Sequence, residues 1–214
     1  VNAALLIVCV GLAQRRGGTA MAVAATIGLA FLVRAFGPVT MVEVWNPWAA
    51  LIPFTALVFV AWSVADGDRA LLPVAVLLAT FTMQTHLAYL FPSMAALTVA
   101  VLAGWVERRE GQGRLGVTWR RTSWRPLLAA VFVGLVGWAV PLYEQITRHP
   151  GNLTLLVRSN QESGARGGLD AARSSLWRTI GVPPKWLRSD ANPAAEILKG
   201  LVAPSGMATV GTLV

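Results

Sequence analysis

The longest apolar stretch of the chain covers residues 70–106, and polar side chains interrupt it once. The interruption consists of Gln84, Thr85 and His86, with Tyr89 shortly after. A membrane-spanning helix needs roughly 20 apolar residues, so a stretch of this length predicts two short helices joined by a turn. Such a turn places Gln84, His86 and Tyr89 together at one face of a membrane.

Further apolar segments predict additional spans, and each is bounded by a polar connection. They cover residues 3–13, 19–33, 47–65 and 126–143, with connections at 14–17, 39–46, 66–69 and 107–125. Pro47 suits the first turn of the helix that it opens. We therefore expect an all-α fold, a polytopic transmembrane bundle of about six spans over residues 1–143. Residues 144–214 are expected to form a separate, partly helical polar segment, with amphipathic spacing at 169–180.

Composition agrees with a membrane protein. Hydrophobic residues make up 55% of the chain, charged residues 13%, and the mean hydropathy is +0.59, whereas soluble domains carry about 25% charged residues. Cys9 is the single cysteine, which excludes a disulfide within the chain and predicts a packing role. The chain enters an apolar segment at once without a basic leader, so we interpret it as a piece of a longer protein. The frequent Ala, Val and Arg are typical of high-GC bacterial coding and suggest a bacterial plasma membrane.

The distribution of basic residues predicts the orientation. The formal net charge is +8, and basic loops that orient a membrane protein explain this better than nucleic-acid binding does. Residues 107–125 contain six Arg and two Glu, so the positive-inside rule makes this loop cytoplasmic. Counting spans backward from it also places the turn at 66–69 inside, together with Arg15 and Arg16. The same count puts residues 39–46, the turn at 84–89 and residues 144–214 outside.

The polar residues of the outer face are the candidate site. Histidine changes its charge near neutral pH, so His86 is suited to bind a phosphate or move a proton; a simple structural hydrogen bond is the alternative. Glu43 and Glu144 offer carboxylates for a base or for holding a hydroxyl, with a solvated carboxylate and an ion pair to Arg148 as the alternatives. We expect Glu43, Asn46, His86 and Glu144 to border one pocket, and the complete candidate set is Glu43, Asn46, Gln84, His86, Tyr89, Glu144 and Gln145.

Other kinds of site have no signature in the sequence. It contains no phosphate-binding loop, no metal-ligand spacing and no Ser-His-Asp arrangement. No metal site or cofactor is therefore assigned, although a divalent cation stays open. The catalytic residue also stays unassigned.

Several short motifs together resemble a family. They are Trp-Asn-Pro-Trp at 45–48, Gln-Thr-His at 84–86 followed by Tyr89, Pro-Leu-Tyr-Glu-Gln at 141–145 and Pro-Gly-Asn-Leu at 150–153. Over residues 1–157 the chain resembles actinobacterial integral membrane proteins related to the GT-C glycosyltransferases. The resemblance implies a multi-span enzyme that takes sugar from a polyprenyl-phosphate donor on the extracytoplasmic side. It also implies an acidic catalytic residue in the first outer loop, which is expected upstream of this chain.

The leading hypothesis is therefore a glycosyltransferase-like membrane protein of cell-envelope glycan assembly. Its expected partners are membrane lipid, the polyprenyl-phosphate sugar donor and a glycan or glycolipid acceptor, without nucleic acid. The alternatives are a polytopic transporter or flippase and a non-catalytic envelope scaffold. A transporter typically carries polar residues at mid-membrane depth, whereas the spans here are nearly free of them.

Overall fold

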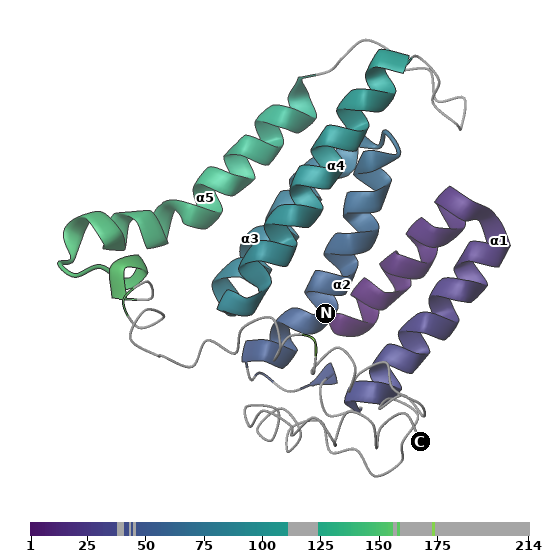
Figure 1. The fold of residues 1–214 in the computed structure, drawn as a ribbon, viewed down its shortest axis with the longest axis horizontal. Helices are drawn as coiled ribbons and strands as arrows, with labels where there is room; N and C mark the ends of the chain where they lie inside the picture. Colours follow the sequence, from purple (N-terminus) through teal and green to yellow (C-terminus); the bar gives the residue numbers. More distant parts are fainter. Residues whose placement is uncertain are drawn as a thin grey trace.

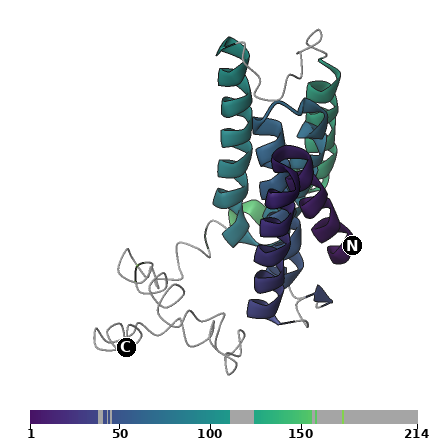
Figure 2. The same cartoon turned by 90° about the vertical axis from the view of Figure 1, so that its right-hand side faces the viewer.

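The structure is a computed structural model, and it describes residues 1–37, 41–42, 44, 46–110, 124–155, 158 and 173. All regular structure within this part of the chain is helical. The α-helices are α1 (Asn2–Phe36), α2 (Asn46–Ala65), α3 (Leu72–Thr85), α4 (Leu90–Glu110) and α5 (Arg125–Thr147), and the short 3₁₀ helices are η2 (Arg69–Leu71) and η3 (Leu87–Tyr89). The long helices run up and down beside one another (Figures 1 and 2). The predicted all-α class is confirmed.

Four of the helical segments are long and apolar enough to cross a membrane: α1, α2, Leu87–Gly104 and α5. The segment Arg69–Thr85, which contains α3, is apolar but shorter. The outer surface of α5 is also apolar, with Phe132 67% exposed and Leu135 64% exposed. Contiguous exposed apolar surface of this kind is typical of contact with lipid. These features support the predicted integral membrane protein.

Helix α1 is a hairpin of two arms. Gly18 has a φ of 70° and divides a first arm, residues 2–17, from a second arm, residues 19–36, and the two arms open like a V (Figure 1). Glycine adopts positive φ without a Cβ clash, which explains why the chain reverses here. The predicted break at residues 14–17 therefore lies immediately before the observed one.

The core of the bundle forms around α2. Leu57, Val60 and Val64 of α2 are buried, together with Cys9 and Leu12 from the first arm of α1. Cys9 has no exposed surface, which confirms its packing role. Helices α1, α3 and α4 all pack against α2, and α5 packs against α3.

The break in the apolar stretch 70–106 is confirmed, but one of its two helices is longer than expected. Extended backbone at His86 (φ −154°, ψ 130°) ends α3 after 14 residues. Helix α4 has 21 residues and continues to Glu110, so the prediction of a second short helix is wrong. Residues 107–110 are Glu-Arg-Arg-Glu, which are good helix formers and extend the helix into the predicted polar loop.

Helix α5 also extends beyond its apolar part. It begins with Pro126 in its first turn, as expected for a span starting there, and passes through Pro141 to Thr147. Glu144 and Gln145 therefore lie in the last turn of the helix and not in the connection after it. Residues 152–155 form one further helical turn. The predicted amphipathic helix at 169–180 falls outside the described residues except for Arg173.

Candidate functional site

Charged side chains join two turns at one end of the bundle, here called the Arg16 end. Arg16 lies just before the α1 hairpin turn, and its guanidinium contacts a carboxylate oxygen of Asp66 at 3.0 Å and one of Asp68 at 2.9 Å. Only 5% of the Arg16 side chain is exposed. Arg15 also contacts Asp68, at 3.0 Å, but its side chain is 64% exposed. The sequence placed these two turns on the same face, and the contacts bring them together.

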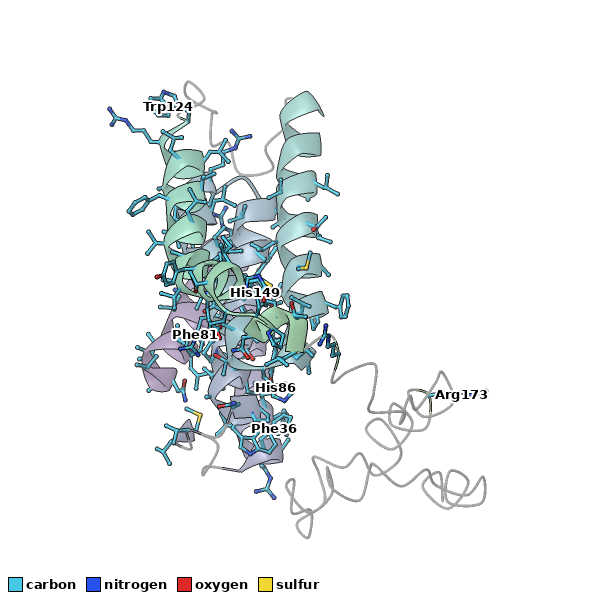
Figure 3. All side chains as sticks on the ribbon, turned by 90° about the vertical axis from the view of Figure 1, so that its left-hand side faces the viewer. Phe36, Phe81, His86, Trp124, His149 and Arg173 are labelled. Carbon is cyan, nitrogen blue, oxygen red and sulfur yellow. The ribbon has the colours of Figure 1, made fainter. Side chains whose placement is uncertain are left out.

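His86 marks the opposite end, here called the His86 end (Figure 3). Its Nδ1 accepts a hydrogen bond from the backbone N–H of Ala88 at 3.2 Å and thereby caps η3. A neutral ring that accepts at Nδ1 carries its proton on Nε2. Nε2 makes no hydrogen bond with the residues that the structure describes, so this N–H is available as a donor.

Tyr89 connects the turn that carries His86 to the start of α2. Its hydroxyl donates to the backbone carbonyl of Pro47 at 3.1 Å, and its ring packs against Phe54 with centroids 5.2 Å apart. The ring of His86 lies edge-on to Tyr89, with centroids 6.2 Å apart. The first turn of α2, which includes the exposed Asn46, and the turn that carries His86 therefore lie at the same end of the bundle.

A buried pair of hydroxyls fixes the two helices that meet at this turn. Thr82 Oγ1 of α3 lies 2.9 Å from Ser93 Oγ of α4, and neither residue has exposed surface. Thr82 Oγ1 also donates to the backbone carbonyls of Leu78 at 2.9 Å and Ala79 at 3.0 Å in its own helix. Hydrogen bonds between helices are worth about 0.6 kcal/mol on average in membranes. The pair therefore helps to hold α3 and α4 in a defined arrangement next to the turn that carries His86.

Gln84 has a structural partner. Its Nε2 donates to the carbonyl of Gly137 in α5 at 2.7 Å. That carbonyl would normally accept from the N–H of the residue four positions later, which is Pro141, and proline has no N–H. Neighbouring side chains commonly satisfy backbone groups freed by proline in membrane helices. Gln84 was predicted only as a candidate binding residue, although the spacing Gly137–Pro141 shows in the sequence which carbonyl is freed.

Glu144 and Gln145 have partners within their own segment. Arg148 lies 3.9 Å from Glu144, which is the ion pair expected as the structural alternative. The side-chain carbonyl of Gln145 accepts from the backbone N–H groups of Leu153 at 3.0 Å and Thr154 at 3.3 Å. Its amide donates to the Thr154 hydroxyl at 2.7 Å. These bonds fold the turn at 152–155 back onto the end of α5.

The structure thus brings together part of the candidate set. The rings of Tyr89 and His86 contact each other, and the Tyr89 hydroxyl bonds to Pro47, the residue next to Asn46. Gln84 connects this turn to α5, whereas the bonds of Glu144 and Gln145 lie within residues 144–154. Glu43 lies outside the described residues, so the common pocket of Glu43, Asn46, His86 and Glu144 stays a prediction.

The described residues contain no group of three His, Cys, Asp or Glu side chains that could hold a metal ion. The side chains immediately around His86 are instead neutral donors and acceptors beside apolar helices: an imidazole N–H, the Tyr89 phenol and the side chain of Asn46. Such groups suit an uncharged hydroxyl or a phosphate oxygen. Comparison with protein-family models, with curated proteins and with solved structures finds no match to this chain.

Proposed function

We propose that this chain forms part of the membrane domain of a GT-C-like glycosyltransferase, which transfers sugar from a polyprenyl-phosphate donor to an envelope glycan or glycolipid. The observation that carries the proposal is the arrangement of His86, whose Nδ1 is held by Ala88 so that Nε2–H is left as a donor. The sequence motifs at residues 45–48, 84–89 and 141–145 support the same assignment.

In this proposal His86 binds an oxygen of the donor phosphate. When the acceptor hydroxyl attacks the anomeric carbon, the bond between that carbon and the phosphate oxygen breaks and negative charge grows on the departing phosphate. A donor N–H aimed at that oxygen stabilises this charge. The acceptor proton passes to a carboxylate base, which the family resemblance implies in a first outer loop. Tyr89 acts as a positioning residue because it anchors the turn to Pro47.

The proposed topology has six spans: the two arms of α1, then α2, α3, α4 and α5. The loop at 107–125 faces the cytoplasm of a bacterial cell, because it carries the excess of arginine. The His86 end and residues 144–214 then face the outside, where polyprenyl-phosphate sugars are used in the proposed reaction. The ion pairs of Arg16 with Asp66 and Asp68 lie at the cytoplasmic end in this arrangement.

The test is sugar transfer in membranes containing the full-length protein, with labelled polyprenyl-phosphate sugar as donor. His86→Ala should lower transfer by about tenfold or more, the value of a hydrogen bond to a charged group, at an unchanged protein level. His149→Ala is the matched control, because His149 is the other histidine and lies exposed after α5 (Figure 3). Equal transfer by His86→Ala and wild type would refute the role of His86. Absence of transfer by the wild type, with lipid translocation instead, would favour the flippase.

A further inference from the structure

The two arms of α1 enclose an open groove of about 830 Å³. Most of its lining residues are apolar, and the polar ones are Gln14, Thr26 and Arg34. The lining includes Leu6, Val10 and Gly11 of the first arm and Leu29, Val33 and Arg34 of the second. The V formed by the arms is visible in Figure 1.

Arg34 gives this groove a charged mouth. It lies in the last turn of α1, close to Phe36, whose ring packs on Trp48 at the start of α2 with centroids 5.4 Å apart. Aromatic rings and arginine at helix ends are typical of the membrane interface. Arg34 makes no ion pair or hydrogen bond with any residue in the described ranges, so its guanidinium is available to an anion.

We propose that this groove binds an acyl chain of an anionic glycerophospholipid, with the lipid phosphate on Arg34. Charge complementarity supports an anionic headgroup, since arginine binds phosphate through two parallel N–H donors. The length of the groove supports an acyl chain. From Arg34 to Thr26 the second arm rises about 12 Å, at about 1.5 Å per residue, which is close to the depth of one leaflet of a hydrocarbon core about 30 Å thick.

The proposal does not depend on sugar transfer. A bilayer lipid held between the arms of α1 fills the space between them and keeps them apart. The groove lining ends at Gln14 and Thr26, before the turn at Gly18 where the two arms meet, so the groove fits one acyl chain better than a much longer isoprenoid chain. The site is therefore expected to prefer phosphatidylglycerol over both phosphatidylethanolamine and polyprenyl phosphate.

The first test asks whether the groove holds a lipid. The measurement is the lipid adduct seen by native mass spectrometry of the full chain, purified in mild detergent with added phosphatidylglycerol. Gly11 lines the groove, and a Cβ at Gly11 meets no atom within 4 Å. Gly11→Leu should place its side chain in the acyl path and abolish the lipid adduct. Gly28→Leu is the matched control, because Gly28 also has open space around its Cβ but does not line the groove. Equal lipid retention by the two variants would overturn the proposal.

The second test removes the charge of Arg34 and uses the same preparation. Arg34→Gln should lower phosphatidylglycerol occupancy by about fivefold, the value of one arginine at an anionic interface. Arg125→Gln, at the exposed start of α5, should leave it unchanged. Equal losses in the two variants would overturn the assignment, because they would indicate general surface attraction. Equal binding of phosphatidylethanolamine, preferential binding of polyprenyl phosphate, or a lipid-free dimer through α1 would also overturn it.

Discussion

Gln84 and Pro141 should be energetically coupled, although one is in α3 and the other in α5. The perturbation is Gln84→Leu, which keeps the size of the side chain but removes the donor 2.7 Å from the Gly137 carbonyl. Because Pro141 supplies no N–H, that carbonyl then has no partner within its own helix. In Pro141→Ala the backbone N–H returns, and the carbonyl no longer needs Gln84.

The expected loss in the free energy of unfolding depends on whether the Gly137 carbonyl keeps a hydrogen-bond partner. The bond lies at an exposed surface of the bundle, where lipid offers the carbonyl no replacement partner, and measured hydrogen bonds between membrane helices average about 0.6 kcal/mol and reach about 1.7 kcal/mol. We therefore expect Gln84→Leu to lower the free energy of unfolding by about 1–1.5 kcal/mol in the wild type. In the Pro141→Ala background the same substitution should cost less than about 0.5 kcal/mol, which gives a coupling energy of about 1 kcal/mol.

The assay is reversible unfolding in mixed micelles titrated with sodium dodecyl sulfate, followed by helix circular dichroism for the wild type, both single variants and the double variant. Thr85→Ala is the control in both backgrounds, because among the described residues the Thr85 hydroxyl bonds the Phe81 carbonyl of its own helix and no group of α5. Thr85→Ala should show no coupling to Pro141. If Gln84→Leu costs the same with and without Pro141, the hydrogen bond does not compensate for the proline and the reasoning is wrong.

Three further outcomes are expected. Arg16→Ala should lower the free energy of unfolding by about 3 kcal/mol in the same assay, because it leaves Asp66 and Asp68 without their largely buried partner. Arg15 is mostly exposed, so Arg15→Ala should cost less than about 1 kcal/mol. Equal losses in the two variants would contradict the burial argument. Gly137→Ala should cost about 1–3 kcal/mol through overpacking, since its Cβ would lie 2.7 Å from a methyl group of α3, while Gly134→Ala, with 3.5 Å of space, should be tolerated. Gln112→Cys should not react with an impermeant thiol reagent from outside intact cells, and labelling there would reverse the proposed topology.

Sequence patterns alone were enough to predict the helical class, the approximate position of each long helix and the break at His86. These features depend on local properties: long apolar stretches form helices because backbone polar groups have no other partner in lipid, and the polar residues 84–86 interrupt such a stretch. Proline in the first turns of α2 and α5 also fits its predicted place. Helix ends were less accurate, because helices α4 and α5 continue into charged or polar residues that are themselves good helix formers.

Which side of each helix is packed becomes evident only from the arrangement of the helices in space. Helices α2 and α5 each contain an 18-residue stretch of the same hydropathy, yet Leu57 of α2 is fully buried and Phe132 of α5 is mostly exposed. A helix that is apolar on all sides carries no stripe to indicate its neighbours, so neither the central place of α2 nor the open groove of α1 is evident from the sequence. The role of Gln84 depends on the same information: its polar side chain suggested a binding site, and the neighbouring α5 supplied its partner, the carbonyl that Pro141 leaves free.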